Sequence, residues 1–274
     1  MNLPTDLKLV DALGQPHVPA PDARIVSLVP SITELLCDLG LAQQVVGRTG
    51  FCIHPAAVVQ GIAKVGGTKD VNIEKIRKLA PTHVVVNIDE NEKPTVDKLA
   101  EFVPNIVVTH PLVPQDNLAL ARLMDGIFGA GEAAGRWCTD FERELAALRA
   151  VAPGPARTVL YCIWQDPWMS VSPQTYIAAM LAELGWKVPS LALDGTRYPR
   201  FAWSDEPVSQ LDAVLLSTEP YRFTEEHADA LERQLGIPVF LVDGEMMSWY
   251  GSRALAGLRY LREVRAMVEG SVTG

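Results

Sequence analysis

The sequence predicts an α/β fold of two Rossmann-like parallel-sheet lobes bridged by one long α-helix, with a ligand cleft between the lobes. Three observations lead to this prediction. Short apolar runs typical of buried strands alternate with amphipathic segments typical of helices. One such strand–helix pattern occurs twice, far apart in the chain. Between the two copies lies a long segment without strand character.

The first core strand and the helix after it set the pattern. Residues 24–29 (RIVSLV) have the Ile, Val and Leu content of a strand buried on both faces, and Pro30 ends the strand. Ser31 and Glu34 predict a capping box, in which two side chains satisfy free backbone donors of a helix start. Gly40 stands where the helix needs a left-handed C-terminal residue. In an open α/β sheet, the residues that follow such a strand face the ligand.

The internal repeat relates the two halves of the chain. Residues 32–41 (ITELLCDLGL) and 177–186 (IAAMLAELGW) share an Ile, two Leu, an acid and a Gly, and each segment follows an apolar strand. Two copies of a β-α-β-α-β-α unit predict two parallel-sheet lobes. Later strands correspond in the same order, 82–88 with 212–218 and 105–110 with 237–243.

The middle of the chain has the pattern of helices. Residues 117–128 predict one helix and residues 132–151 a second, with a continuous apolar face formed by Trp137, Phe141, Leu145 and Leu148. We expect this segment to be the only covalent bridge between the lobes and to resist bending. The predicted parts are an N-terminal lobe at 1–116 with an opening hairpin at 7–18, a bridging segment at 117–152, and a C-terminal lobe at 153–274.

Composition and charge narrow the class of protein. The chain has 274 residues, of which 48% are hydrophobic and 21% charged, as in ordinary globular proteins. Its net charge of −9 argues against nucleic acid or an anionic membrane as the main partner. The cysteines are widely spaced without a CxxC pair, so neither a disulfide framework nor a zinc knuckle is predicted. The N-terminus has no apolar signal-peptide core and no lipid-attachment cysteine.

No enzymatic activity is predicted, because no catalytic motif is present. The sequence has no GxSxG elbow, no HExxH, no Walker loop and no dinucleotide-binding GxGxxG after a strand. No catalytic residue and no intrinsic cofactor is therefore assigned. Two-lobed α/β folds also host chelatases, so a cytoplasmic protein or enzyme that handles a metal or metallocofactor stays open as the alternative.

Several segments together resemble one known family. They are the opening hairpin with residues 11–36 (DALGQPHVPAPDARIVSLVPSITELL), residues 65–86 (VGGTKDVNIEKIRKLAPTHVVV), the linking helix and the repeat in the second half. With these segments, nearly the whole chain resembles the helical-backbone (class III) substrate-binding proteins of ABC importers for vitamin B12, ferric siderophores and haem. It is most similar to the cobalamin-binding branch. Thr68 and Ile88 depart from that branch, which carries aromatic residues at these places.

The resemblance implies a function. The protein would bind a metal chelate without transforming it, with a corrinoid such as vitamin B12 as first choice and a ferric siderophore or haem next. It would act as a monomer in the periplasm and deliver its ligand to an ABC permease dimer. The lack of a recognisable signal peptide leaves two expectations open, either an export signal that has been removed or a cytoplasmic protein.

Ligand contacts are predicted after strands in both lobes. A phenylalanine and a polar trio follow strands of the first lobe; the alternative is a core position for the phenylalanine and a plain turn for the trio. Tryptophans just past a strand of the second lobe favour contact with a flat macrocycle, because exposed indole rings cost solubility. The predicted ligand-binding residues are Phe51, Asp89, Glu90, Asn91, Trp164, Trp168, Met169, Tyr198, Trp203, Glu245, Trp249 and Tyr250.

Two acidic residues match the positions at which the family docks on arginines of the permease. They are Glu74, in NIEKI, and Glu206, in WSDEPVSQL. Each lies near a predicted helix start, where the helix dipole also favours a carboxylate. The alternative for each is a solvated acid at a helix start.

Direct metal ligation is a separate hypothesis. Cys52 and His54 have C-x-H spacing, and His110 follows a predicted strand. With Glu90 or Glu245 they could bind zinc or iron, or supply an axial ligand to haem or cobalt. Because no spacing here is a recognised metal motif, a buried thiol and hydrogen-bonded imidazoles are the alternative.

Overall fold

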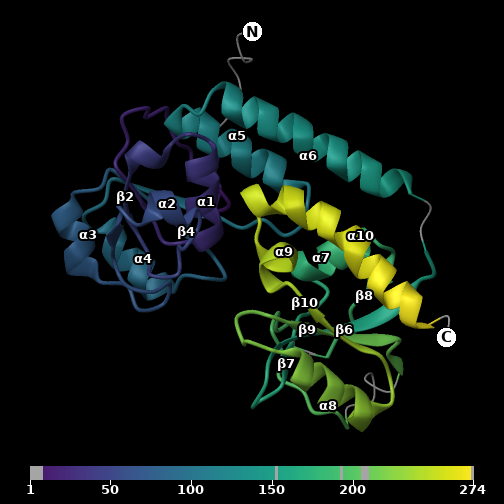
Figure 1. The fold of residues 1–274 in the computed structure, drawn as a ribbon. Coiled ribbons are helices and arrows are strands. Elements are labelled where there is room, and N and C mark those ends of the chain that lie inside the picture. The colour runs from purple at the N-terminus through teal and green to yellow at the C-terminus, as the bar shows by residue number, and fades with distance from the viewer. Residues whose placement is uncertain (1–8, 152–153, 192–193, 205–209, 273–274) are drawn as a thin grey trace. The chain divides into compact units, whose positions relative to one another are not determined.

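The structure is a computed structural model that describes residues 9–151, 154–191, 194–204 and 210–272. In it the chain divides into two units, each with its own, mainly parallel β-sheet (Figure 1). The predicted fold class, a pair of parallel-sheet lobes with helices, is confirmed. Unit 1 comprises Met1–Pro111, Gln115–Asp140 and Tyr250–Ser252, and unit 2 comprises Leu112–Pro114, Phe141–Trp249 and Arg253–Gly274.

The sheet of unit 1 is parallel throughout, with strand order β3-β2-β1-β4-β5. All residues of β1 and β4 are buried, because the central strands of a parallel sheet are covered on both faces. The apolar run at 24–29 predicts this burial correctly. The strands are β1 (Ile25–Ser27), β2 (Val45–Arg48), β3 (Ala63–Lys64), β4 (His83–Asn87) and β5 (Asn105–Thr109).

Three helices of unit 1 pack against this sheet, α1 (Pro30–Asp38), α3 (Ile73–Leu79) and α4 (Lys93–Ala100) (Figure 1). Aliphatic side chains from α3, α4, the strands and the adjoining loops form one core cluster of the unit, in which every member is nearly inaccessible to water. The remaining helical elements are η1 (Ala42–Gln44), α2 (Ala56–Val59) and α5 (Asp116–Phe128).

The capping box predicted at the start of α1 is wrong. The helix already begins at Pro30, with Val29 as the N-cap residue and no side-chain cap. Proline suits the first helical position because its φ is fixed near the helical value and its missing N–H would have no partner there. The end of the helix agrees with the prediction, since Gly40 adopts a left-handed φ of 80°.

A tight turn precedes β1 and is tied to the edge strand β5. Val10 and Pro16 form an isolated antiparallel bridge inside the predicted hairpin at 7–18, whose first two residues lie outside the described residues. The buried carboxylate of Asp11 accepts hydrogen bonds from three backbone N–H groups, one of them that of Val108 in β5 at 3.0 Å. Because two of these donors lie in the turn, the carboxylate fixes the turn against the sheet.

The sheet of unit 2 has strand order β10-β9-β6-β7, and β8 also pairs with β6. The parallel pairs β6–β8, β6–β9 and β9–β10 repeat the pairs β1–β2, β1–β4 and β4–β5 of unit 1. The internal repeat in the sequence is therefore confirmed as a structural repeat, to which unit 2 adds the antiparallel β7. The strands are β6 (Arg157–Trp164), β7 (Met169–Ser170), β8 (Trp186–Lys187), β9 (Ala213–Ser217) and β10 (Val239–Val242).

Polar side chains cap the starts of two helices of unit 2. The Thr175 hydroxyl accepts from the N–H of Ala178, and the Asp243 carboxylate accepts from the N–H of Met246. Such caps each stabilise a helix by about 1 kcal/mol. The helices are α7 (Tyr176–Ala182), α8 (Glu225–Leu235), α9 (Gly244–Ser248) and α10 (Ser252–Val272).

Helix α6 (Glu132–Ala150) confirms the long helix predicted in the middle of the chain. On its apolar face Phe141, Leu145 and Leu148 are buried, and Trp137 is partly buried. Residues of α6 before Phe141 belong to unit 1 and the others to unit 2.

The chain passes between the units at more places than α6. Leu112–Pro114 belongs to unit 2 and Tyr250–Ser252 to unit 1, although each segment lies among residues of the other unit in sequence. The helical bridge is therefore not the only covalent connection, contrary to the expectation from the sequence.

Helix α10 is the longest helix described, with 21 residues. Arg259 and Arg262 on α10 lie 2.9 and 3.3 Å from the carboxylate of Glu144 on α6.

In the described part of the chain, no helix is both long enough and apolar enough to cross a lipid bilayer.

His83, the first residue of β4, is a buried titratable residue of unit 1. Its side chain is buried, its Nδ1 lies 2.9 Å from Thr82 Oγ1, and its ring meets Phe128 edge-on at 5.3 Å. Burial lowers the pKa of His83, and the neighbouring His17 lowers it further. The neutral imidazole is therefore the form that the folded unit accommodates.

We predict that the free energy of unfolding decreases as the pH falls below about 6.5, because the unfolded chain binds the proton that the buried His83 ring disfavours. The His83→Gln variant should lose less stability than the wild type between about pH 7.5 and about pH 5.5. Urea denaturation at the two pH values measures this difference. An equal loss in both proteins would contradict the role of His83.

Candidate functional site

The carboxyl ends of the strands of a parallel sheet meet at one edge, and in open α/β sheets this edge binds ligands. In unit 1 we name as edge 1 the residues that follow β2, β4 and β5, namely Phe51, Ile53, Ile88, Asp89, Glu90 and His110. In unit 2 we name as edge 2 the last residue of β6 and residues that follow β9 and β10, namely Trp164, Glu219, Glu245, Ser248 and Trp249.

Edge 1 exposes three large apolar side chains. Phe51, Ile53 and Ile88 are 63%, 52% and 43% exposed. Large exposed apolar side chains at an edge that can bind ligands favour a role in binding a ligand or partner. Gly67 leaves room for the Phe51 ring, because a Cβ at this glycine would lie 3.3 Å from it. Phe51, predicted from the sequence as a ligand contact, is the most exposed of the three, and the structure adds Ile53 to this edge.

Asp89 and His110 form a polar pair on edge 1. His110 Nε2 lies 3.5 Å from Asp89 Oδ2, and both side chains are partly exposed. The backbone N–H of Asp89 donates to Oδ1 of the buried Asn87 at 2.8 Å, so the end of β4 fixes the position of Asp89. The structure thus places this predicted ligand contact at the edge, and gives His110 a carboxylate as its neighbour.

Glu90 is held by Tyr250, a residue distant in sequence that belongs to the same unit. Tyr250 Oη donates to Glu90 Oε1 at 2.5 Å, and Tyr250 is buried. Burial raises the pKa of Tyr250 and the Glu90 carboxylate raises it further, so the phenol remains a donor. The next residue is anchored as well, because the N–H of Gly251 donates to Asn117 Oδ1 at 2.6 Å. Tyr250, predicted as a ligand contact, is here a buried residue that positions Glu90.

Asn91 is engaged by the backbone of unit 1. Its Oδ1 accepts from the N–H of Asn87 at 2.9 Å. Its Nδ2 donates to the carbonyl oxygens of Leu28 and Thr68 at 3.3 and 3.0 Å. These bonds join the ends of β1 and β4 to the loop before α3, so the buried Asn91 amide holds edge 1 together, although the sequence pattern predicts a ligand contact.

The described residues hold no group of three or more His, Cys, Asp or Glu side chains that could bind a metal ion. The metal site predicted at Cys52, His54 and His110 has no counterpart in this structure. Cys52 is buried, and its sulfur lies 3.1 Å from the hydroxyl oxygens of both Thr33 and Thr49. Burial raises the pKa of the Cys52 thiol, which disfavours the thiolate that metal ligation requires.

Aromatic residues of unit 2 form one continuous cluster. Trp168 stacks on Phe223 with ring centroids 5.8 Å apart, and it meets Trp203 edge-on at 5.0 Å. Both tryptophans are partly buried and pack against the core of the unit. Burying large aromatic rings stabilises the folded unit. These two predicted ligand contacts therefore contribute to the packing of unit 2.

Trp164 is the exposed member of this cluster. It ends β6, is 39% exposed, and meets Tyr221 edge-on at 5.5 Å. The other predicted residues nearby are less accessible, since Met169 pairs with Trp164 as part of β7 and Tyr198 is partly buried. Trp164 is therefore the tryptophan of this cluster that edge 2 presents to solvent.

Glu245 and Trp249, both predicted ligand contacts, share Arg253 as a partner. Arg253 Nη1 lies 2.7 Å from Glu245 Oε2, and the guanidinium carbon lies 5.0 Å from the centre of the Trp249 ring. The charged side chains of this ion pair are largely withdrawn from water. Arg253 thereby connects the start of α10 to the carboxylate and the indole of edge 2.

Glu219 is a residue of edge 2 that the sequence motifs miss. Its Oε1 accepts from Trp249 Nε1 at 2.6 Å and from Ser248 Oγ at 3.2 Å. Burial raises the pKa of Glu219, which the bonds from Trp249 and Ser248 partly offset. The internal repeat contains a signal for this residue, because the alignment of 82–88 with 212–218 places Glu219 opposite Asp89.

Of the two acids predicted to dock on a permease, Glu74 lies in the described part of the chain. It stands in the first turn of α3, which Asn72 caps by accepting from the N–H of Lys75. The Glu74 side chain is 75% exposed and lies 3.7 Å from Arg77. Glu206 lies outside the described residues.

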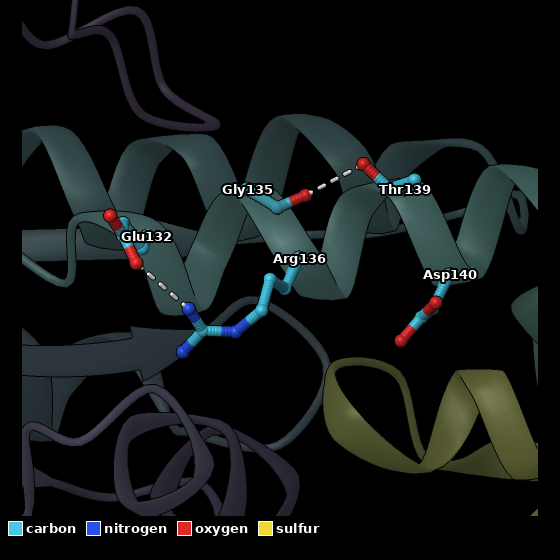
Figure 2. Close-up of a pocket in the computed structure, with 5 residues that line it drawn as sticks. All are labelled: Glu132, Gly135, Arg136, Thr139 and Asp140. Atoms are coloured by element: carbon cyan, nitrogen blue, oxygen red, sulfur yellow. Dashed lines mark hydrogen bonds and ion pairs between the residues drawn. The ribbon is translucent and has the colours of Figure 1, made fainter. Parts of the chain in front are cut away.

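A shallow depression on α6 is a separate surface feature. Figure 2 shows its five lining residues, Glu132, Gly135, Arg136, Thr139 and Asp140, which all come from this one helix. Glu132 and Arg136 form an exposed ion pair at 3.1 Å, and Thr139 Oγ1 donates to the Gly135 carbonyl at 3.0 Å. The depression contains no residue predicted from the sequence, and its polar contacts are those of an ordinary helix surface.

The sequence matches the family model described as "Periplasmic binding protein" over residues 25–196. This chain belongs to that family. The family resemblance drawn from the motifs of the sequence is thereby confirmed, and members of the family are binding proteins and not enzymes. The two parallel-sheet lobes of this periplasmic binding protein agree with that membership.

Relatives and solved structures agree in fold. The vitamin B12-binding protein of Pectobacterium carotovorum subsp. carotovorum (strain PC1) is 23% identical over 252 residues, 90% of each chain. The periplasmic vitamin B12 binding protein BtuF of Vibrio cholerae superposes with a TM-score of 0.77 at 19% identity, covering 92% of this chain and 99% of that chain. The periplasmic haem binding protein HutB of Vibrio cholerae gives 0.72 at 20% identity, covering 89% and 98%. At such low identity these structures establish the fold alone.

We predict that the Tyr250→Phe variant unfolds more readily, because the Glu90 carboxylate loses its buried donor. A hydrogen bond to a charged group contributes about 1.5–3 kcal/mol, and the unfolding free energy should decrease by that amount. Tyr221→Phe is the matched control, since no described residue bonds to the Tyr221 hydroxyl. Urea denaturation measures both variants, and equal effects would show that the Tyr250–Glu90 bond contributes nothing.

Proposed function

We propose that this periplasmic binding protein binds a corrinoid of the vitamin B12 class and delivers it to an ABC importer without transforming it. Family membership supports the binding role, and the relatives whose names specify vitamin B12 support the ligand class. Edges 1 and 2 would supply the ligand contacts, because both lie at the carboxyl ends of parallel strands.

The charge of the two edges is the observation that carries the choice of ligand. Each edge has two carboxylates, Asp89 and Glu90 on edge 1 and Glu219 and Glu245 on edge 2. The His110 imidazole faces Asp89, and the Arg253 guanidinium faces Glu245. Haem has two propionates and many ferric siderophores are anionic, so acidic edges would repel them. The amide groups around a corrin ring are neutral and donate hydrogen bonds that carboxylates accept.

The apolar residues of edge 1 suit the rest of such a ligand. A corrin ring has broad apolar faces, and Phe51, Ile53 and Ile88 stand exposed beside the acids. Trp164 adds an exposed indole on edge 2. Full burial of one large apolar side chain contributes about 1.5–3 kcal/mol, so a few such contacts support tight binding.

The ligand class is tested by titration of the protein with cyanocobalamin, haemin and a ferric siderophore, followed by tryptophan fluorescence. We expect saturable quenching by cyanocobalamin, and binding of the two other chelates at least about tenfold weaker because of charge repulsion. Tighter binding of haemin or of the siderophore would overturn the corrinoid assignment.

The role of edge 1 is tested with the Phe51→Ala variant. We expect about tenfold weaker cyanocobalamin binding, since the lost apolar contact corresponds to about 1.4 kcal/mol. Val18→Ala is the control, because Val18 is 71% exposed and lies outside edge 1. If both variants bind like the wild type, Phe51 does not contact the ligand.

Delivery to an importer implies a periplasmic location and contact with an ABC permease dimer. We expect Glu74→Gln, combined with Glu206→Gln, to reduce uptake by vesicles containing the permease about tenfold, because two ion pairs with the permease would be lost. The cyanocobalamin affinity should stay unchanged. Glu101→Gln is the control, since Glu101 is an exposed acid of unit 1 at the end of α4. Unchanged uptake by the double variant would exclude the predicted docking.

A further inference from the structure

Glu219 occupies a crowded position at the end of β9. The Ser217 hydroxyl, which accepts from Tyr161 Oη at 3.0 Å, donates to the carbonyl of Glu219 at 2.6 Å. A Cβ at Gly244 would lie 2.6 Å from Glu219 Cγ and 2.5 Å from Ser217 Oγ. Only a glycine therefore lets the start of α9 approach Glu219 so closely, and this approach brings the residues at the end of α9 to its carboxylate.

The two oxygens of the Glu219 carboxylate have different surroundings. Oε1 accepts from both Trp249 Nε1 and Ser248 Oγ, at 2.6 and 3.2 Å. No described residue donates to Oε2, and the side chain is partly exposed. One oxygen is thus committed to the protein, and the other is available to a donor from solution.

The Trp249 indole is fixed from two directions. Its N–H donates to Glu219, and the guanidinium of Arg253 lies over its ring at 5.0 Å, a favourable cation–π distance. Arg253 is in turn held by Glu245 at 2.7 Å. A ring fixed in this way has lost its rotational freedom before a ligand arrives, which lowers the entropic cost of binding.

The repeat provides an independent argument for the same position. Glu219 corresponds to Asp89 of unit 1, a predicted ligand contact. In both units the buried polar residue two places earlier braces the acid. Asn87 Oδ1 accepts from the N–H of Asp89 at 2.8 Å, and Ser217 Oγ accepts from the N–H of Glu219 at 3.4 Å. The same strand-end arrangement thus presents an acid in each unit.

We propose that Glu219 is a ligand-binding residue of edge 2, which positions the Trp249 indole through Oε1 and offers Oε2 to a neutral hydrogen-bond donor of the ligand, such as a carboxamide. This inference rests on the proposed function and extends it, because it names the chemical group that edge 2 recognises. A ligand that presents a carboxylate at this place would meet like charge from Glu219 and Glu245.

The positioning role is tested without ligand, by proton–nitrogen NMR of the indole N–H groups. The chain has six tryptophans, and Trp249→Phe identifies the Trp249 peak by its loss. We expect Glu219→Ala to move this peak strongly, whereas Glu219→Gln retains an acceptor oxygen and moves it less. Glu225→Gln, at an exposed acid on α8, is the control and should leave the peak in place. An unmoved peak in Glu219→Ala would overturn the positioning role whatever the protein binds.

A pH titration of the same peak adds a readout that packing alone would not change. Burial raises the pKa of Glu219, so the wild-type peak should shift as the pH falls through a value above that of an ordinary glutamate. Asp243 and Glu245 face the same carboxylate and raise its pKa as well, and Trp249 and Ser248 lower it. The Glu219→Gln variant should lose this titration. A shift that persists in Glu219→Gln would show that the peak does not report on Glu219 and would contradict the proposal.

The proposed ligand contact is tested by titrating the same variants with cyanocobalamin. We expect about tenfold weaker binding by Glu219→Gln, which keeps Trp249 in place but loses the acceptor for the ligand, and a larger loss in Glu219→Ala. In the Glu219→Ala background, adding Trp249→Phe should weaken cyanocobalamin binding little beyond the loss that Glu219→Ala causes by itself. Wild-type affinity in Glu219→Gln would overturn the ligand bond. Wild-type protein that binds no corrinoid would refute the proposed function and the ligand bond together, while the indole peak still decides the positioning role.

Discussion

Parallel pairing around buried central strands is the constraint on which the rest of this structure depends. A parallel pair cannot be closed by a tight turn, so each strand needs a crossover connection, and such connections have one hand. The carboxyl ends of β1, β2, β4 and β5 consequently meet at one edge of unit 1, and those of β6, β9 and β10 at one edge of unit 2. Because helices cover the faces, the strand ends are where the chain can offer side chains to a ligand.

The same constraint explains why many polar residues at these edges bond to the protein itself. Where a strand ladder stops, its backbone groups still need partners, and side chains supply them. Asn91 joins three segments of unit 1 in this way, and Asn87 and Ser217 brace the acids that follow β4 and β9. A polar cluster at a strand end is therefore a mixture, in which some members hold the loops and others, such as Asp89 and Glu219, are the ligand contacts that we propose.

The exposure of the candidate site residues could be predicted in part, and the differences have physical causes. Phe51 lies exposed where its place after the second strand suggests, because a loop after a short parallel strand returns to the surface. Trp168 and Trp203 were equally good candidates by composition, yet they pack on Phe223 and the core, since a ring next to several others is buried by them. Cys52 was a candidate metal ligand by its spacing from His54, but its thiol contacts two threonine hydroxyls, and burial raises the pKa of the thiol.

The sequence by itself determined the alternation of strands and helices, the duplication of one supersecondary unit, the long central helix and the family, because hydrophobic periodicity and motifs are local properties. Only the tertiary structure decided which side chains at the two edges remain accessible. Tyr250 reaches Glu90 across a sequence separation of 160 residues, and Trp249 reaches Glu219 across 30. Such pairs depend on how loops from different strands converge, and on side chains that compete for the same donors and the same space, which no local pattern in the chain records.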